Sequence, residues 1–559
     1  MFPRRNRLRA LALALSAALT FFYLLTPSGP PSSAPESVRL SWHMNHRAPS
    51  PTFKESTVNY RSIPPSNPPP EPLIRLPTPR PAPLPAIQHP FPDSTDSISS
   101  ARRLEVRALF RRDWATYRAH AWGRDALLPL SLRGRNQFSG WAATLVDALD
   151  ALYLLGLRAE FNEAVAYVSS LDFGVATSSH VNTFETTIRY LGGLLSAYEL
   201  SGREVLLRKA VELGDVLYSA FDTPSRLPVD WIDLRRVKAG KAQDPEARVV
   251  SAAVGTLSLE MTRLSQLTGD PRYFDAVARV MRLFASGQNS TAIPGLWPLW
   301  VSMDAGDVVN GTKFTLGGGA DSLYEYLPKM HLLLEGGDPT YETMTRGFLN
   351  AAETLFFRPM LPDGVEEDIL ISGSVEVHRD GEITLEPETE HLTCFIGGAF
   401  ALAGRILGDQ GAVDTGARLA RGCAYLYRAV SSGIMPERLT LLPCPSLSTH
   451  TPCPWNQTLY DEETNRRKWK ENPPVPITSV KDPRYLLRPE AVESLFVLYR
   501  VTGEEEFRER AWEMFLAIRE AAGAAGVSAV VQDVLKEELV REDYMEVSYV
   551  PALRARFRV

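Results

Sequence analysis

The sequence predicts an all-α fold in which helical hairpins are arranged as a toroid or a solenoid. From Ala101 onward, apolar residues recur at helical spacing and few stretches alternate as strands do. A loose repeat of an apolar helix, a glycine-containing turn and a second helix runs through this region, which is typical of stacked αα units. Glycine suits the end of a helix because the left-handed conformation brings it no side-chain clash. The glycines of the repeat are Gly156, Gly202, Gly269, Gly337, Gly408 and Gly503. An irregular helical domain is the alternative interpretation.

The bulk composition is that of a globular protein and excludes some function classes. Of the 559 residues, 44% are hydrophobic and 23% are charged, and the formal net charge is −6. A nucleic-acid-binding protein needs a basic face, so we expect no nucleic-acid partner. Four cysteines are too few for a disulfide scaffold in a chain of this length, and they fit one or two bridges added to a core.

The N-terminal region predicts a membrane anchor followed by a stem. Residues 1–9 carry four arginines and precede an uncharged run at residues 10–26. That run is near the lower length limit for crossing a bilayer, and we interpret it as an uncleaved signal anchor with residues 1–9 in the cytosol. A cleaved signal peptide is the alternative. Residues 27–100 are rich in proline and serine and predict an extended, disordered stem.

Residues 101–559 then form the lumenal body of a type II membrane protein. The sequons at Asn289, Asn310 and Asn456 agree with that location. Acidic residues stand in the first turn of several apolar helices in this body, namely Glu185, Asp321, and Glu490 with Glu493. Taken singly, each has a structural interpretation: Glu185 completes a capping box with Asn182, and a carboxylate early in a helix favours the dipole.

Taken together, these acids indicate a shared site. Inner helices of a toroid begin at one end, so their first-turn acids converge on one mouth of the ring. Arg189 and Arg488 then enter the same mouth. Several carboxylates with interleaved arginines suit glycosidic hydrolysis, in which one acid protonates the leaving oxygen and another group activates water.

Four segments resemble the motifs of the class I α-1,2-mannosidases, glycoside hydrolase family 47. They are FETTIRYLGGLLSAY (184–198), TLGGGADSLYEYL (315–327), HLTCFIGGAFALAG (391–404) and LRPEAVESLFVLYRVTG (487–503). The resemblance runs from about residue 105 to residue 546, with the motifs in family order. It implies an (α/α)7 barrel in the endoplasmic reticulum or Golgi membrane. It also implies a calcium-dependent, inverting, monomeric enzyme that removes terminal α-1,2-linked mannose from high-mannose N-glycans.

The resemblance also implies roles for individual residues. Glu185 matches the general acid, Glu490 the general base and Asp321 a third essential carboxylate. The residues that match sugar- or water-binding positions are Arg189, His391, Glu437, Arg488 and Glu493. Cys394 and Cys423 match the family disulfide, and Cys444 and Cys453 are candidates for a second, local bridge, although the sequence alone leaves three pairings open. Gly319 stands where members that remove one particular mannose have an arginine, which implies a broader trimming preference.

The chain departs from the family pattern at three places. Ala126 and Ala253 replace family acids, which implies weaker contacts with the substrate. The match ceases after Glu546, so the last inner helix and the calcium-ligating threonine have no counterpart, and we assign no metal ligand. We interpret residues 547–559 as read-through into an intron, which leaves the barrel incomplete. A non-catalytic or weakly active mannose-binding factor of glycoprotein quality control is the alternative function.

Overall fold

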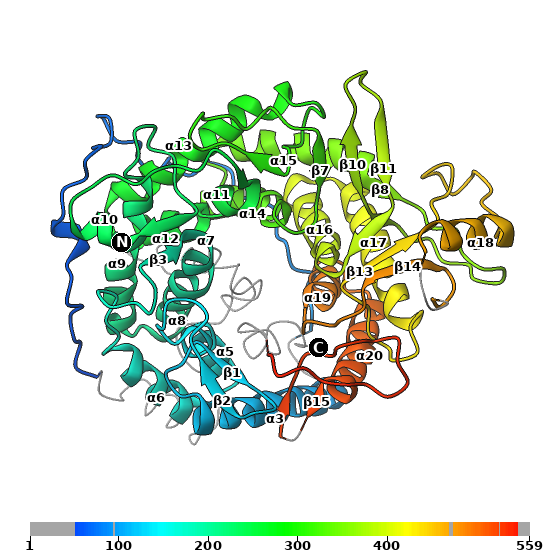
Figure 1. Cartoon of the computed structure of the whole chain (residues 1–559), viewed down its shortest axis with the longest axis horizontal. Helices are drawn as coiled ribbons and strands as arrows, with labels where there is room; N and C mark the ends of the chain where they lie inside the picture. The colour runs from blue at the N-terminus through cyan, green and yellow to red at the C-terminus, as the bar shows by residue number, and fades with distance from the viewer. Residues whose placement is uncertain (1–50, 93–95, 469–472, 525, 546–559) are drawn as a thin grey trace.

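The computed structural model describes residues 51–92, 96–468, 473–524 and 526–545, and its helices form a ring of two concentric layers (Figure 1). Inner and outer helices alternate along the chain, and each inner helix packs on its neighbours in the ring and on the outer helix that follows it. The predicted α/α barrel is therefore confirmed. The cytosolic tail and the anchor predicted at residues 1–9 and 10–26 lie outside the described residues.

The inner layer is apolar on most sides, because each of its helices is covered by both layers. Its helices are α5 (Leu149–Leu154), α8 (Gly192–Ser201), α12 (Ser258–Thr268), α14 (Asp321–Leu333), α16 (Phe395–Leu407) and α19 (Glu490–Thr502). The outer layer contains α3 (Ser97–His120), α6 (Arg158–Val168), α9 (Glu204–Tyr218), α13 (Pro271–Gly287), α15 (Pro339–Ala352), α17 (Gln410–Arg428) and α20 (Glu505–Ala521). Each inner helix contacts the next from α5 to α19, and among the described residues no inner helix connects α19 back to α5.

Glycine and aspartate set the turns between paired helices. Inner helices end at left-handed glycines, with φ of 67°, 76°, 69° and 80° at Gly202, Gly269, Gly408 and Gly503. The following outer helices α13, α15 and α17 begin at aspartate caps, which are Asp270, Asp338 and Asp409. The prediction was wrong by one residue at Gly337, because the left-handed glycine of that turn is Gly336. These tight turns make each pair antiparallel. The turns lie at one end of the barrel, and the inner helices begin at the other end.

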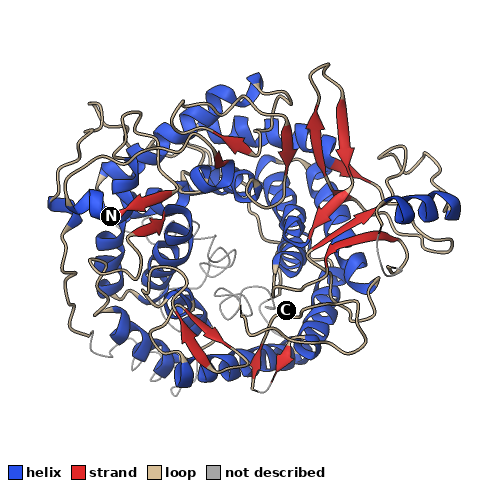
Figure 2. Cartoon of the chain, in the orientation of Figure 1, coloured by secondary structure: helices blue, strands red, loops and turns tan. Residues whose placement is uncertain are grey.

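Short strands precede several inner helices along the chain (Figure 2). β3 (His180–Asn182) pairs with β4 (Trp231–Asp233), and β5 (Val249–Val250) pairs with β6 (Trp300–Val301). β7 (Lys313–Thr315) joins β10 (Ser374–Val377) and β11 (Ile383–Glu386) in one sheet. β12 (Glu388–Glu390), β13 (Arg438–Leu441) and β14 (Ile477–Asp482) form another, in that order. These strands are too short to give the alternation that predicts strands from sequence.

Residues 51–92 form a belt on the outside of the barrel, drawn in blue in Figure 1. Apart from a 3-10 turn at Tyr60–Ser62 the belt has no helix or strand, as its prolines predict. Its backbone N–H groups nevertheless donate to carboxylates of the body: Ser56 to Glu212, Thr57 to Asp172, Asn67 to Asp222 and Ile74 to Asp275. Residues 51–92 are docked on the barrel, because its side chains satisfy the polar groups that an extended chain cannot pair by itself. The earlier part of the predicted stem, residues 27–50, lies outside the described residues.

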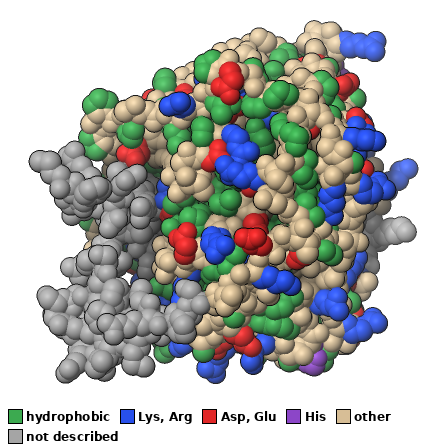
Figure 3. Space-filling view, turned by 90° about the vertical axis from the view of Figure 1, so that its left-hand side faces the viewer, with side chains coloured by type: hydrophobic (Ala, Val, Ile, Leu, Met, Phe, Trp, Pro, Cys, Tyr) green, Lys and Arg blue, Asp and Glu red, His purple; other side chains and the backbone are tan. Residues whose placement is uncertain are grey.

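A buried lysine anchors the start of the belt, and an aromatic contact anchors its end. Lys209 on α9 is 0% exposed, and its Nζ donates to the carbonyls of Lys54 and Leu171, each at 2.6 Å, and to Glu212 at 2.8 Å. At the other end the Phe91 ring packs on Tyr499, with centroids 4.9 Å apart. Both ends of the belt therefore pack against the barrel, and the domain boundary at residue 101 stays a prediction. On the side that carries the start of the belt, charges of both signs are interspersed with apolar groups (Figure 3).

Two disulfides tie the α16–α17 region and the loop that follows it. Cys394, directly before α16, is bonded to Cys423 in α17, as the resemblance implied. Cys444 is bonded to Cys453, ahead of α18 (Gln457–Arg466). None of the helices in the described ranges combines the length and the apolar character that crossing a bilayer requires.

Candidate active site

Four predicted site residues converge where the β12–β13–β14 sheet meets α16 and α19. His391 follows β12, Glu437 precedes β13, and Arg488 and Glu490 follow β14. The backbone N–H of His391 donates to the Glu437 carbonyl at 2.8 Å, and the Glu437 N–H donates to the Arg484 carbonyl at 2.9 Å. Because adjacent strands deliver these residues, the sheet fixes their relative positions.

The Glu437 carboxylate holds the segment that precedes α19. Glu437 is 5% exposed, accepts a hydrogen bond from the Leu486 N–H at 3.0 Å and forms an ion pair with the Arg488 guanidinium. A buried carboxylate needs such partners because desolvation of an unpaired charge is costly. Glu437 therefore fixes Arg488, whose side chain stays 30% exposed.

His391 lies directly behind Glu490. The ring is 0% exposed, its Nε2 is 2.7 Å from the Tyr427 hydroxyl, and its Nδ1 is 3.8 Å from Glu490 Oε2. Tyr485 packs edge-on against the ring, at 5.6 Å between centroids. The complete burial of His391 favours a role in positioning Glu490 over direct contact with a sugar.

Glu185 and Arg189 form a second part of the site. Glu185 lies in the single turn of α7 (Thr183–Glu185), and its N–H donates to the capping Asn182 side chain at 2.8 Å. Arg189 Nε is 2.7 Å from Glu185 Oε2, and Arg189 Nη1 is 3.9 Å from Asp147 Oδ2. Residues 186–191 form a π-helical turn, a geometry that is frequent at functional sites. The Glu185 side chain is 30% exposed, so it remains accessible to a ligand.

Asp321 begins α14 and is electrostatically linked to Glu490. Its carboxylate accepts a hydrogen bond from the Ser322 N–H at 2.9 Å. The pKa of Asp321 is raised to about 7, mainly by burial and also by the charges of Glu325, Glu490 and Glu390, against a lowering by the Ser322 hydrogen bond. Two of the three predicted catalytic carboxylates therefore lie within electrostatic reach of each other.

Glu390, which the sequence did not single out, is a further carboxylate near Asp321. Glu390 Oε2 accepts a hydrogen bond from the Gly318 N–H at 2.8 Å, and Oε1 lies 3.6 Å from Arg438 Nε. The available signal was its position directly before His391 at the end of the ETEH run, residues 388–391. Glu390 ties the loop before Asp321 to the sheet that carries His391.

Asp125 was also missed, and it organises the entry to the inner layer. It is 0% exposed, and its carboxylate accepts hydrogen bonds from the N–H groups of Phe138, Gly140 and Ala143 and from the Tyr190 hydroxyl. The neighbouring Ala126 and the later Ala253 are buried, at 1% and 6% exposure. Glu493, one turn after Glu490 in α19, is 8% exposed.

Gly319 has a backbone conformation that side chains rarely adopt. Its φ is +93°, and a Cβ built there lies 3.1 Å from both Leu299 Cδ1 and Val250 Cγ1. A larger residue at this position is strained unless the loop moves. The broader trimming preference inferred from Gly319 stays a prediction.

The described residues do not supply a ready cage for a metal ion. Calcium takes about six to eight oxygen ligands. In the described ranges, no three His, Cys, Asp or Glu side chains gather as a metal-binding group. Carboxylates and histidines among the described residues therefore do not form a calcium site by themselves, and no step below is routed through that ion.

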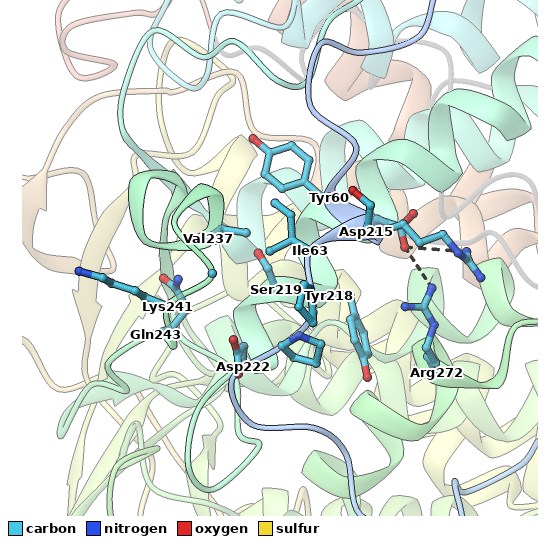
Figure 4. Close-up of a pocket in the computed structure, with 15 residues that line it drawn as sticks. Tyr60, Ile63, Asp215, Tyr218, Ser219, Asp222, Val237, Lys241, Gln243 and Arg272 are labelled. Atoms are coloured by element: carbon cyan, nitrogen blue, oxygen red, sulfur yellow. Dashed lines mark hydrogen bonds and ion pairs between the residues drawn. The ribbon is translucent and has the colours of Figure 1, made fainter.

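A cavity of about 230 Å³ under the belt is another candidate position for an active site (Figure 4). It contains two carboxylates, but both are committed to structural partners. Asp215 pairs with Arg272 at 3.2 Å and accepts the Tyr273 hydroxyl at 2.8 Å, while Asp222 accepts hydrogen bonds from the belt backbone. The carboxylates at the starts of the inner helices therefore form the stronger candidate for acid–base chemistry.

Known proteins resemble the chain over the same region. The family model of glycosyl hydrolase family 47 matches residues 109–552, so the expected end of the resemblance at residue 546 was too early. The chain is 32% identical over 454 residues to the probable mannosyl-oligosaccharide alpha-1,2-mannosidase 1B of Neosartorya fischeri, covering 78% of this chain and 85% of that protein. It is 31% identical over 469 residues to the mannosyl-oligosaccharide alpha-1,2-mannosidase of Coccidioides posadasii, covering 81% and 84%. The alpha-1,2-mannosidase from Trichoderma reesei superposes with a TM-score of 0.72 at 28% identity, covering 82% of this chain and 93% of that one.

Proposed function

The chain belongs to glycosyl hydrolase family 47 and is a glycosidase, and we propose how its residues remove terminal α-1,2-linked mannose from high-mannose N-glycans. One observation carries the proposal. Glu185, Asp321 and Glu490 each occupy the first turn of a helix that starts at the same end of the barrel. Carboxylates that converge from separate helices provide the acid and the base that glycosidic hydrolysis needs.

We assign the proton donor to Glu185 and the base to Glu490. In hydrolysis with inversion, one carboxylic acid protonates the leaving oxygen while a carboxylate on the other face activates water, with about 6.5–9.5 Å between the two groups. The ion pair with Arg189 orients the Glu185 carboxylate. His391 orients Glu490 from behind, since its Nδ1 faces Glu490 Oε2 at 3.8 Å.

Asp321 and the arginines bind the sugar in this proposal. With a pKa raised by burial to about 7, Asp321 holds its proton in mildly acidic solution and then donates a hydrogen bond to a sugar hydroxyl. Arg488, held by Glu437, presents its guanidinium next to Glu490. Arg189 and Glu493 complete the set of groups that contact the terminal mannose or its attacking water.

The cellular setting is proposed as the lumen of the endoplasmic reticulum or Golgi. Two disulfides favour an oxidising compartment, and the sequons agree with it. We propose anchorage through residues 10–26, a monomeric state and a requirement for calcium on the strength of family membership. When bound, calcium supplies a positive charge that binds sugar hydroxyls.

Release of mannose from a purified high-mannose glycan tests the proposal. We expect the secreted chain from residue 51 onward to release mannose, and proton NMR of the first product to show the β-anomer, because attack of water from the opposite face inverts the α-linkage. Glu185→Gln and Glu490→Gln should each lower kcat at least a hundredfold. The exposed Glu376→Gln is the matched control and should leave kcat unchanged. Binding of the glycan with no release by the unsubstituted chain overturns the enzyme assignment in favour of a mannose-binding factor.

A further inference from the structure

Two tryptophan side chains stand exposed on β4 and β6, the strands that pair with β3 and β5. Trp231 in β4 is 52% exposed and Trp300 in β6 is 39% exposed. Indole rings are large and apolar, and proteins mostly bury them, while Trp is enriched where a surface binds a partner. Neither ring has a role in the acid–base arrangement described above.

Trp231 is coupled through its strand to Glu185. In the β3–β4 pair its backbone partner is Asn182, the residue whose side chain caps the turn that carries Glu185. Residues directly opposite in antiparallel strands lie on the same face of the pair, with Cα atoms about 4.5–5.5 Å apart. The Trp231 ring therefore lies on the Asn182 face, at the edge of the site formed by Glu185.

Trp300 is coupled in the same way to the loop before Asp321. Its backbone partner is Val250, the last residue of β5. Two residues after β5, the Ala252 N–H donates to the Gly319 carbonyl of that loop at 2.8 Å. Leu299, beside Trp300, contacts Gly319. The Arg248 guanidinium covers one face of the Trp300 ring, 4.1 Å from its centroid, and fixes the ring.

A single glutamate connects the β3–β4 strand pair to the β5–β6 strand pair. The Glu246 carboxylate accepts hydrogen bonds from the N–H groups of Asp230 and Trp231 at 3.0 and 3.2 Å. The Glu246 carbonyl accepts hydrogen bonds from Met303 and Asp304, which follow β6, at 3.1 and 3.3 Å. The two tryptophans therefore belong to one rim between Glu185 and Asp321, which we call the tryptophan rim.

The part of the rim that faces the loop before Asp321 is apolar. Ala253 and Gly319 have no side-chain donor or acceptor, and Leu299 and Val250 are apolar. A sugar unit here can therefore be held by contact of its C–H faces with the aromatic rings. The terminal mannose is bound by the carboxylates and arginines, so the rings meet the next units of the glycan.

On the basis of the function proposed above, we propose that the tryptophan rim binds the mannose units beyond the scissile bond and sets the preference for long glycan arms over short ones. Trp231 stacks on a sugar at least two units beyond the scissile bond, which mannobiose lacks, and Trp300 stacks on a neighbouring arm. The rim thereby replaces with stacking the polar contacts that Ala253 and Gly319 do not provide.

Comparison of a long and a short ligand tests the rim. Trp231→Ala and Trp300→Ala are placed in the Glu490→Gln background, which leaves the ligand intact, and calorimetry measures Kd for the free nine-mannose glycan and for α-1,2-mannobiose. We expect each tryptophan variant to raise Kd for the nine-mannose glycan about tenfold, in line with about 1–3 kcal/mol for stacking on an aromatic ring. The Kd for mannobiose should change less than twofold. Trp231→Phe should restore most of the affinity, because it keeps a flat apolar face.

Trp455→Ala is the matched control, since this half-buried indole lies by α18, away from the inner helices, and should change neither Kd. Equal loss for both ligands identifies a structural role and overturns the rim, as does unchanged affinity for the nine-mannose glycan or its failure to bind the Glu490→Gln chain. Failure of the proposed function gives a different result: the unsubstituted chain releases no mannose, while the tryptophan variants still weaken binding of the long glycan.

Discussion

Replacement of Tyr60 by alanine tests whether the belt is part of the folded barrel. Tyr60 is 6% exposed, and its hydroxyl lies 3.4 Å from the Phe173 carbonyl. Truncation of a buried aromatic side chain typically costs about 3–5 kcal/mol. Because the belt covers the barrel from outside and the vacated site opens to water, we expect the lower end, about 3 kcal/mol. A disordered stem predicts no change.

Limited proteolysis reads out this loss directly. If the belt opens locally before cleavage, a loss of about 3 kcal/mol raises the open population, and hence tryptic cleavage after Arg75, about a hundredfold. Glu55→Ala is the control, because Glu55 is an exposed residue of the same segment and should leave cleavage unchanged. A change of less than about threefold in Tyr60→Ala, or rapid cleavage of the unsubstituted belt, refutes the docked belt.

Three further substitutions probe the barrel and the site. Burial raises the pKa of Glu260 to about 7, so its folded-state pKa exceeds the unfolded value, and stability present in acid is lost as pH rises through 7. Glu260→Gln keeps an acceptor for Tyr326 and should remove up to about 2 kcal/mol of that loss, measured as urea unfolding at pH 5.5 and 8.5; parallel pH slopes contradict this. Joint replacement of Cys394 and Cys423 by serine opens a bridge between residues 29 positions apart and should cost about 3–4 kcal/mol, seen as a lower urea midpoint. Arg488→Met leaves buried Glu437 without its cation and should lower kcat at least tenfold together with stability; an unchanged kcat excludes Arg488 from the site.

The sequence by itself determined the hairpin architecture and the candidate acids, because both depend on local physical rules. A glycine such as Gly408 ends a helix because it readily adopts a left-handed φ. An aspartate such as Asp409 caps the next helix because its side chain accepts a hydrogen bond from the N–H three residues later. First-turn acids such as Glu490 are visible for the same reason, since helix starts have a recognisable pattern. The strands escaped prediction because they span only two to six residues.

Only the tertiary structure decided what depends on partners distant in the chain. The belt docks because its backbone meets carboxylates 115–201 residues away, and composition alone cannot reveal those acceptors. His391 lies behind Glu490, and Glu437 holds Arg488, because three separate strands pair in one sheet. Trp231 and Trp300 belong to one rim because Glu246 connects the β3–β4 and β5–β6 strand pairs. Local preferences limit each segment to a few conformations, but the pairing of distant segments is chosen by burial and hydrogen-bond satisfaction over the whole fold.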